Sequence, residues 1–594
     1  MLASDPFDRV LIIDLTKRRA TVVHRPDLIE GALGGVGLAA RLLQEECPDG
    51  ADPLGPENPI ILAVGPLSGL FPMASKTIAM FKSPHTGNLG ESHAGGRSAI
   101  AIRMAGYCAI VIRGASSSPV YLVIEGDKVH FRDARAMWGM HSAYPAGSII
   151  RERESGAGMR TIMRIGPAGE KGVSYASVVT ETYRHFGRLG LGAVFGSKLL
   201  KGIVVSGVRS LPVSDPRLYR RTYDEIFKAT TESTLFKKYH ELGTAVNVLP
   251  LDALGALPTR NLQAGHYEGA AHISGERLAE EYLGRRVACA HCPVACIHLA
   301  AVRFPYPDQP YFYKTNMIPY DHEPVFAAGS MLGGKDGQHD TRGMFALLDM
   351  ADSLGLDVMS MGCTLAWATE ALERGVIGPK ETDGLMLAWG DYPTYVQAAE
   401  RIISQPNDFY AALARGAEYA GQQYGGADYA LAMGGNEMAG YHTGPACYVG
   451  YLAGARNSHL DNAGYALDQK SAQNGGLTPE KVGQELVAEE RWRQVLNSLV
   501  ICMFARNLYT PDLVQRSLKV AGIEMSMDDL ARLGQETLVL KHEFKRRCGF
   551  DLEGVRIPRR ILETPTPAGV LDEGFLRQAL QVYRQNVLPD AVAA

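Results

Sequence analysis

Three cysteines lie close together in the middle of the chain, in the segment Cys289-Ala-His-Cys292-Pro-Val-Ala-Cys296. Thiolates are soft ligands, so this C-x2-C-x3-C spacing can hold a thiophilic metal, and iron–sulfur clusters are bound mainly by thiolates. A cubane cluster needs a fourth ligand, and the best candidate is Cys502, far downstream in the sequence. The spacing predicts a [4Fe–4S] cluster that acts as a buried redox relay inside a large enzyme.

The same spacing leaves two other interpretations open. A C-x2-C pair followed by His291 or His298 also matches a structural zinc site, and the thiols can equally have no ligand. A zinc knuckle usually takes its second ligand pair from nearby sequence, whereas the next cysteine, Cys363, has the surroundings of an ordinary helix-core thiol. The spacing therefore favours iron–sulfur ligation modestly.

A second chemical signal is the run Gly187-Arg188-Leu-Gly190-Leu-Gly192-Ala-Val-Phe-Gly196-Ser-Lys198. Backbone N–H groups and basic side chains in such a run can converge on a phosphate. The run does not open a strand–helix unit with an acidic residue about twenty positions on, which argues against a Rossmann dinucleotide site. It is either an anion-binding loop or a tight structural turn.

These segments together resemble the aldehyde ferredoxin oxidoreductase family, tungsten enzymes with molybdenum-containing relatives. The family's G-R-x-G-x-G-A-V-x-G-S-K segment matches 187–198, and its cysteine triplet with a remote fourth cysteine is matched as well. Its D-x-x-G-L-D motif matches Asp352-Ser-Leu-Gly355-Leu356-Asp357. The segments 65–69, 83–87 and 95–96 resemble its β domain, and the similarity covers nearly the whole chain in the same order.

The resemblance implies a bis-pyranopterin cofactor with one tungsten or molybdenum, beside a [4Fe–4S] cluster, with Mg²⁺ bridging the pterin phosphates. The sequence does not distinguish the two heavy metals. Glycine loops and basic residues suit such a large, polyanionic group. The cofactor-binding residues that the resemblance implies are Lys76, His93, Gly95, Gly96, Arg184, His185, Arg188, Asp352, Gly355, Leu356, Asp357, Asn497 and Ile501.

The resemblance also implies two catalytic residues, Glu323 and His459. A carboxylate near an oxo-metal can activate water or take a proton, and histidine titrates near neutrality. Without the resemblance, Glu323 is more often a surface or helix-terminal carboxylate, and His459 a hydrogen-bonded core histidine. The tyrosine, histidine and glycine positions between Tyr441 and Tyr451 are expected to line the substrate pocket.

Three positions depart from the family pattern. Asn497 stands where a second pterin motif has aspartate, and it offers a neutral, weaker hydrogen bond. Lys76 replaces an arginine and loses the bidentate fork. His93 replaces an asparagine that helps to hold magnesium, and imidazole is a poorer ligand for a hard cation. The departures indicate a divergent branch, whose substrate need not be a plain aldehyde.

The leading hypothesis is an oxidoreductase that converts an aldehyde to a carboxylic acid, or the reverse. Its electrons would pass to a ferredoxin or an iron–sulfur partner subunit, because the chain has only one cysteine group fit for a cluster. One alternative is an enzyme of the same fold that acts on another substrate, such as an activated aromatic ring. Another is a non-catalytic scaffold stabilised by zinc or a cluster. We also expect an oligomer.

The expected strands and helices along the chain indicate an α+β fold. We predict a glycine-rich, pterin-binding β domain followed by two mostly helical domains. We place the domains at 1–210, 211–420 (with the cysteine triplet) and 421–594 (with the fourth cysteine). β-branched runs predict strands at 10–15, 20–24, 60–64, 77–81, 109–113, 120–124, 129–132 and 202–206. The segment Glu125-Gly-Asp-Lys128 predicts a hairpin turn into 129–132. A cap at Ser214 or Asp215 before Pro216 opens the helical part, with helices at 341–354, 395–404 and 485–503.

The composition excludes several classes of protein. A formal net charge of −4 over 594 residues leaves no footprint for nucleic acid, and no apolar run reaches the roughly 18 residues of a membrane helix. The start, Met1-Leu-Ala-Ser-Asp-Pro6, lacks a basic or apolar signal region. Nine cysteines in such a chain indicate reduced thiols. We expect a cytoplasmic protein with no nucleic-acid or membrane partner.

Overall fold

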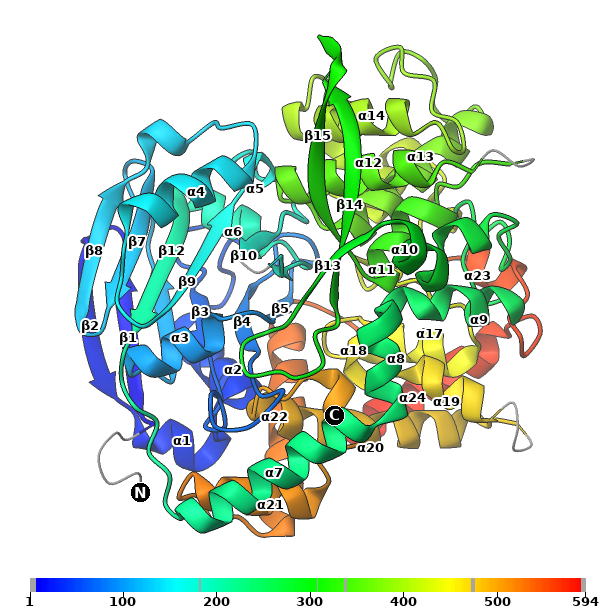
Figure 1. The fold of residues 1–594 in the computed structure, drawn as a ribbon. Coiled ribbons are helices and arrows are strands. Elements are labelled where there is room, and N and C mark those ends of the chain that lie inside the picture. The colour runs from blue at the N-terminus through cyan, green and yellow to red at the C-terminus, as the bar shows by residue number, and fades with distance from the viewer. Residues whose placement is uncertain (1–6, 181–182, 307, 336–338, 472–475, 589–594) are drawn as a thin grey trace.

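The computed structural model (Figure 1) describes residues 7–180, 183–306, 308–335, 339–471 and 476–588. Strands dominate the first two hundred residues and helices dominate the rest, which confirms the α+β prediction. Among the described residues, no helix is long and apolar enough to cross a membrane. The segment 1–6, on which the signal-peptide prediction rests, lies outside them.

The first sheet has six strands in the order β2-β1-β6-β3-β4-β5. Every predicted strand in it forms, because β-branched runs such as Ile60–Ala63 bury all of their side chains. The strands are β1 (Arg9–Asp14), β2 (Arg19–His24), β3 (Ile60–Ala63), β4 (Thr77–Lys82), β5 (Leu89–Ala94) and β6 (Ala109–Arg113).

The second sheet also has six strands, in the order β11-β10-β9-β12-β7-β8. The predicted hairpin joins β7 to β8, with Glu125 paired to Lys128 and Gly126 at a φ of +57° in the turn. The strands are β7 (Val120–Glu125), β8 (Lys128–Asp133), β9 (Met159–Ile165), β10 (Val178–Thr180), β11 (His185–Phe186) and β12 (Leu200–Gly207).

Helices that the strand prediction missed cover these sheets. Helix α2 begins with Gly35-Val-Gly37, a poor helix-forming sequence, and is held instead by packing against α20 and β4. The helices are α1 (Pro26–Ala32), α2 (Gly35–Glu46), α3 (Ser98–Ala105), α4 (Ala143–Arg153), α5 (Pro167–Glu170) and α6 (Leu191–Ser197), with a 3₁₀ turn at Arg135–Met137.

The helical part begins as predicted, with Asp215 capping α7 and Pro216 at its first position. Helix α12 matches its predicted range. The first helices are α7 (Pro216–Glu232), α8 (Thr234–Leu242), α9 (Val248–Ala253), α10 (Gly275–Glu281), α11 (His322–Val325), α12 (Thr341–Leu354), α13 (Val358–Glu373), α14 (Tyr392–Ser404), α15 (Asp408–Leu413) and α16 (Ala417–Tyr424). Short 3₁₀ turns at Thr244–Asn247, Ala270–Ile273 and Ala427–Tyr429 and a π-helical turn at Phe326–Ser330 connect them.

The remaining helices lie between Pro445 and Val587. The prediction of one helix over 485–503 was wrong at both ends, because Thr478 caps the helix earlier and Val500 adopts a φ of +54°, which turns the chain out of it. The helices are α17 (Pro445–Ala453), α18 (His459–Asn462), α19 (Gly464–Ser471), α20 (Pro479–Ser498), α21 (Pro511–Val520), α22 (Met527–Arg547), α23 (Arg560–Glu563) and α24 (Glu573–Val587), with a 3₁₀ turn at Met503–Ala505.

A three-stranded sheet interrupts the helical part, which the sequence prediction did not include. It is formed by β13 (Leu283–Val287), β14 (Ile297–Tyr306) and β15 (Gln309–Tyr320), and the β14–β15 hairpin stands out from the body of the molecule (Figure 1). A two-stranded ribbon, β16 (Ala432–Met433) and β17 (Asn436–Glu437), lies further on. The three-domain division of the chain stays a prediction.

Candidate functional site

A cavity of about 600 Å³ lies where the sheets meet the helical part of the chain. Its walls come from segments that are far apart in the sequence. The predicted site residues that line it are Lys76, His93, Arg184, His185, Arg188, Cys289, Cys292, Cys296, Glu323, Asp352, Leu356, Asp357, His459, Asn497, Ile501 and Cys502. Three further predicted site residues are not among the lining residues but belong to the backbone segments that form the wall: Gly95, Gly96 and Gly355.

Backbone hydrogen bonds bring the two cysteine segments together on a loop of the first sheet. The Met73 N–H donates to the His291 carbonyl at 3.2 Å, and the Cys502 N–H donates to the Met73 carbonyl at 2.8 Å. The Ala290 N–H donates to the Gly96 carbonyl at 2.9 Å. The first sheet is therefore the template that places the remote fourth cysteine beside the triplet.

The four thiols affect one another, as a shared site requires. Burial, with a smaller contribution from the neighbouring thiols Cys502 and Cys289, raises the pKa of Cys292 to about 12. Burial likewise raises the pKa of Cys296, again with Cys502 and Cys289 beside it. Cys292 and Cys296 become thiolates in this setting only if a bound cation offsets their burial and the nearby thiols.

The space beside Cys289 is kept open by a glycine. A side chain on Gly95 would begin 2.6 Å from the Cys289 Sγ and 3.5 Å from the Lys76 Nζ. Among the described residues, no three His, Cys, Asp or Glu side chains converge closely enough for one metal ion. Zinc and cluster ligation of these thiols both stay predictions.

The D-x-x-G-L-D segment forms the junction between α12 and α13. Gly355 ends α12 in the left-handed conformation with a φ of +77°, and the Asp357 side chain caps α13 by accepting from the Met359 and Ser360 N–H groups. The Ser177 N–H, from the first two hundred residues, donates to the Gly355 carbonyl at 2.8 Å. The spacing of the motif therefore follows from the helix end at Gly355 and the helix cap at Asp357, and the motif also lies at the cavity.

Acidic and basic side chains pair along this wall. The Arg188 Nε donates to Asp357 at 3.2 Å and its Nη2 donates to the Glu437 carbonyl at 2.7 Å. The His185 Nε2 lies 3.4 Å from the Asp352 Oδ1 without a hydrogen bond. Burial and the nearby carboxylates Asp349 and Asp321 raise the pKa of Asp352, which favours its protonated form.

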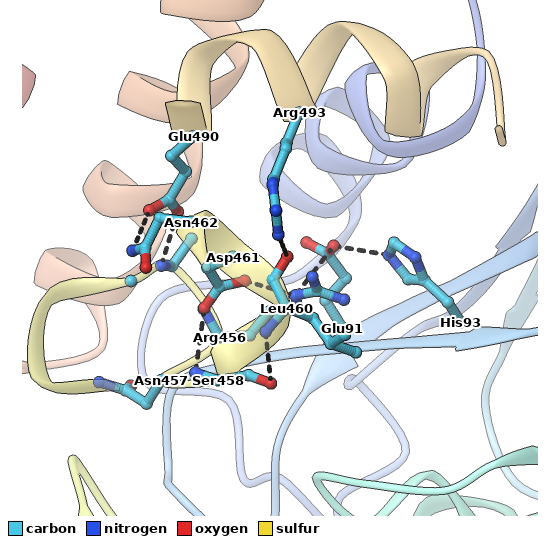
Figure 2. Close-up of polar contacts among 12 residues, drawn as sticks. Glu91, His93, Arg456, Asn457, Ser458, Leu460, Asp461, Asn462, Glu490 and Arg493 are labelled. Atoms are coloured by element: carbon cyan, nitrogen blue, oxygen red, sulfur yellow. Dashed lines mark hydrogen bonds and ion pairs between the residues drawn. The ribbon is translucent and has the colours of Figure 1, made fainter. Parts of the chain in front are cut away.

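His93 is held from behind by a buried ionic network (Figure 2). Its Nε2 lies 2.7 Å from the Glu91 Oε1, and Glu91 also pairs with Lys541 at 2.7 Å and Arg456 at 3.5 Å. Arg456 in turn donates to Asp461 at 2.6 Å. Burial, with Arg456 and Lys541 nearby, lowers the pKa of His93 to about 4. A neutral His93 that donates to Glu91 has only Nδ1 left for a ligand.

The loop after α20 fits tightly against the first sheet. A side chain on Gly35, which has a φ of +42°, would begin 2.2 Å from the Asn497 carbonyl oxygen. The Lys76 N–H donates to the Val500 carbonyl at 3.3 Å. These contacts place Asn497 and Ile501 at the cavity wall, on the same loop as Cys502.

Glu323 and His459 meet in the same cavity. The His459 Nε2 lies 3.1 Å from the Glu323 Oε1, off the direction of a hydrogen bond, and the Tyr441 hydroxyl donates to Glu323 at 3.3 Å. Burial alone would raise the pKa of Glu323, but His459 beside it lowers that pKa to about 2. The pair therefore offers an ionised carboxylate next to an imidazole.

Two expectations need correction. Of the residues between Tyr441 and Tyr451, Tyr441 lines the cavity, whereas Tyr448 and Tyr451 are buried in the core. The Lys198 Nζ turns away from the cavity and donates to the backbone carbonyls of Pro56 and Gly114 at 3.1 and 3.0 Å. A buried lysine that caps loop carbonyls has a structural role, so the glycine-rich run supplies Arg188 alone as a basic group at the site.

The sequence interpretation missed several residues that line the cavity. They include Tyr465, which stacks on Tyr441 with ring centroids 4.4 Å apart, and the basic side chains Arg456, Arg493 and Arg506. The short segment between Arg456 and His459 carried a signal, since a polar run after a glycine-rich helix end is typical of a site loop. The others reach the cavity through tertiary packing.

The cavity suits a polyanionic group with many hydrogen-bonding edges. Among the described residues, Arg188 Nη1, Asn436 Oδ1 and Arg493 Nη2 are buried polar atoms of cavity-lining residues without a hydrogen-bond partner. Buried polar groups in native proteins are nearly always satisfied, so such atoms at a cavity indicate a missing partner. A phosphorylated pterin supplies acceptors and donors for them, and the donor set fits.

Sequence models of one family match nearly all of the chain. The model of the aldehyde ferredoxin oxidoreductase N-terminal domain matches residues 10–207, and that of domains 2 and 3 matches residues 221–586. The chain belongs to the aldehyde ferredoxin oxidoreductase family. Its membership confirms the resemblance on which the site residues were chosen, and it makes the protein an oxidoreductase.

Curated proteins show how far this chain has diverged in sequence from its relatives. A tungsten-containing aldehyde ferredoxin oxidoreductase of Thermococcus kodakarensis is 30% identical over 573 residues, which is 91% of this chain and 89% of that protein. One of Pyrococcus furiosus is 30% identical over 569 residues, with the same coverage of 91% and 89%. An aliphatic sulfonate oxidoreductase, WOR-like subunit, of P. furiosus is 30% identical over 417 residues, 67% of this chain and 64% of that one.

The fold is also similar to a solved structure of a benzoyl coenzyme A reductase. The active site complex BamBC of benzoyl coenzyme A reductase, in complex with 1,5 dienoyl-CoA, superimposes with a TM-score of 0.80. The match covers 98% of this chain and 94% of the other, at 22% identity. It shows a shared architecture.

Proposed function

We propose that this protein is a tungsten- or molybdenum-dependent oxidoreductase that interconverts an aldehyde and a carboxylic acid. The observation that carries the proposal is the convergence of Glu323 and His459 on the cavity that also holds the four thiols. The two curated relatives are named as tungsten-containing, and each match covers 91% of this chain. A bis-pyranopterin centre supplies two-electron chemistry when bound, and a [4Fe–4S] cluster transfers electrons singly.

Cys289, Cys292, Cys296 and Cys502 would hold the cluster, and the pterin would lie against the α12–α13 junction and the basic wall. Arg184 and Arg188 would hold its phosphates by charge-assisted hydrogen bonds. Burial raises the pKa of Asp352, and in its protonated form Asp352 would donate a hydrogen bond to a ring acceptor. Bridging Mg²⁺ remains part of the proposal, although neutral His93 is a poor ligand for it.

The chain's own residues would supply acid–base chemistry beside the metal. Glu323 is ionised, so it can take a proton from the water that adds to the substrate carbonyl. His459 lies next to Glu323 and can relay that proton, while the Tyr441 hydroxyl fixes the carboxylate. Tyr441 and Tyr465 close one side of the space and exclude bulk water.

The electrons would leave through the cluster to a ferredoxin or an iron–sulfur partner subunit. Two comparisons support a partner of this kind, since one relative is described as a subunit and the solved structure is a complex. A second candidate substrate is an activated aromatic ring, which the stacked tyrosines at the cavity favour. Oligomeric assembly stays a prediction.

Anaerobic assay of the holoprotein tests the proposal. Acetaldehyde and benzaldehyde are supplied with benzyl viologen as electron acceptor, and the carboxylic acid formed is quantified. Aldehyde-dependent dye reduction with two electrons per acid supports the proposal. A tungsten-loaded protein that reduces no dye with either aldehyde, yet oxidises reduced viologen when benzoyl-CoA is added, favours the aromatic candidate and contradicts the first.

A further inference from the structure

Two arginines, Arg493 and Arg506, line the cavity that also holds Glu323 and His459. Arg493 lies in α20, and its Nη1 donates to the Leu460 carbonyl at 2.8 Å, one residue after His459 (Figure 2). Arg506 directly follows the 3₁₀ turn at the end of that loop. Arg493 is therefore held beside the turn that carries His459, and not on the α12–α13 wall proposed for the pterin.

Two tyrosine hydroxyls in the cavity wall lie near both Arg506 and Glu323. Burial raises the pKa of Tyr465, nearby Glu323 also raises it, and nearby Arg506 and Arg493 lower it. Burial likewise raises the pKa of Tyr239, with Glu323 acting in the same direction and Arg506 in the opposite one. Both hydroxyls therefore stay protonated, with a carboxylate and a guanidinium as common neighbours.

Aromatic stacking fixes these two tyrosines in the wall. Tyr239, in α8, stacks on Phe504 with ring centroids 4.7 Å apart, and Tyr465, in α19, stacks on Tyr441 at 4.4 Å. Both tyrosines line the cavity, and neither hydroxyl has a hydrogen-bond partner among the described residues. Each hydroxyl is therefore available to donate to a bound molecule.

The two arginines keep hydrogen-bonding capacity for an anion. Arg493 is 3% exposed and donates through Nε to Glu489 at 2.8 Å, whereas its Nη2 has no partner in the described part of the chain. Arg506 donates to the Met503 carbonyl at 3.2 Å and forms no ion pair with any described residue. Guanidinium groups with free N–H donors match a carboxylate, which can accept two parallel hydrogen bonds.

The charges give this part of the cavity a direction. The ionised Glu323 carboxylate repels a second carboxylate, whereas Arg506 and Arg493 attract one. An aldehyde with a carboxylate at its far end would therefore bind with the aldehyde group toward Glu323 and the carboxylate toward the arginines. A neutral aldehyde of the same shape would leave the guanidinium donors without a partner, which costs binding free energy.

We propose that Arg506, Arg493 and the hydroxyls of Tyr239 and Tyr465 form a carboxylate-binding subsite, and that the substrate is a short-chain aldehyde with a second, terminal carboxylate. The inference rests on the proposed function, in which an aldehyde and one water give a carboxylic acid, two protons and two electrons. The electrons pass to an external acceptor such as a viologen. The four groups of the subsite bind and orient the substrate and take no part in these transfers.

Anaerobic, viologen-linked kinetics of the holoenzyme with two matched aldehydes tests the subsite. Succinic semialdehyde carries the carboxylate, and 4-methylpentanal has an uncharged isopropyl group of similar shape in its place. We expect kcat/KM of the wild-type enzyme to be at least about tenfold higher for the semialdehyde. Arg506→Gln should lose most of this preference through a higher KM for the semialdehyde, while kcat/KM for 4-methylpentanal stays within about twofold.

Two further variants control for charge and for packing. Arg506→Lys keeps the charge but loses the planar fork, so it should recover part of the preference. Arg491→Gln removes another arginine of α20, one that donates to the Asn586 carbonyl at 2.7 Å and is not a lining residue, and it should keep the full preference. A wild-type enzyme without preference for the semialdehyde overturns the subsite, as does an undiminished preference in both Arg506→Gln and Arg493→Gln.

Isothermal titration calorimetry separates failure of the subsite from failure of the proposed function, because it needs no turnover. Succinate is titrated into the holoprotein, with 4-methylpentanoate as the monocarboxylate of matched shape. We expect succinate to bind at least about tenfold more tightly, and this advantage to be lost in Arg506→Gln but kept in Arg491→Gln. A protein that oxidises neither aldehyde but shows this pattern contradicts the aldehyde substrate and supports the subsite. Equal affinities of the wild-type protein for the two acids, or an unchanged succinate affinity in Arg506→Gln, overturn the subsite.

Discussion

At the scale of single residues, Glu323 and His459 carry the proposed chemistry. Replacing His459 by Asn removes the imidazole 3.1 Å from the carboxylate, and Glu323→Gln removes the ionised acceptor. Because acid–base groups typically contribute about 10²–10⁴-fold, we expect turnover to fall by about 10²-fold or more in each variant. Tungsten and iron contents should be unchanged, as plasma mass spectrometry will show.

Tyr441→Phe is the matched control for this pair. It removes the hydroxyl that donates to Glu323 but keeps the ring stacked on Tyr465. We expect a loss of less than about tenfold, in line with a single hydrogen bond of about 1 kcal/mol. Turnover of His459→Asn within twofold of the wild-type rate would remove that residue from the mechanism.

At the scale of elements, the loop after α20 depends on a close approach to the start of α2. Gly35→Ala would place a methyl group 2.2 Å from the Asn497 carbonyl oxygen. Overpacking of this kind costs about 1–3 kcal/mol, and the positive φ adds to it, so the thermal midpoint and the iron content should both fall. Gly50→Ala has a φ of +71° but open space around it, so it isolates the backbone effect. Equal effects of the two substitutions would contradict the account of the loop.

The contact between α17 and the chain near Pro565 should make stability depend on pH. Burial lowers the pKa of His442 to about 4, and its ring bonds to the Tyr448 hydroxyl and the Pro565 carbonyl. The unfolded chain takes up this proton below pH about 6.5, but the folded chain stays neutral. The stability is therefore full above about pH 6.5 and declines toward pH 4, by up to about 3 kcal/mol.

Thermal midpoints at pH 7.5 and pH 5.0 check this dependence. We expect the thermal midpoint of the wild-type protein to be lower at pH 5.0 than at pH 7.5. His442→Gln should have a lower midpoint at pH 7.5 and a smaller decrease from pH 7.5 to pH 5.0. His298 has only a modest pKa shift and also lies in a buried hydrogen-bond network, so His298→Gln serves as the comparison. An identical pH slope in wild type and His442→Gln would rule out this source.

The elements that the sequence predicted correctly are those whose structure is determined by neighbouring residues. The hairpin at Gly126 and the cap at Asp215 with Pro216 have causes within a few residues, and both form as predicted. The start of α2 and the end of α20 were missed because each is set by the other across more than four hundred residues. Of the proposed site residues, most motif positions line the cavity as expected, whereas Tyr465 and Arg493 reach it only through packing.

At the scale of the whole molecule, the fold converts distant motifs into one site. The first sheet holds the loop at Met73, on which both cysteine segments are bonded, and the α12–α13 junction closes the opposite wall. The four thiols and the Glu323–His459 pair therefore line one cavity.

Metal content of the anaerobically purified protein, by plasma mass spectrometry, tests the central claim most directly. The account predicts one tungsten or molybdenum and about four irons per chain. Iron should be lost in Cys502→Ala and retained in Cys363→Ala, a buried thiol of α13 away from the cavity. Zinc alone, or full iron in Cys502→Ala, would contradict the account.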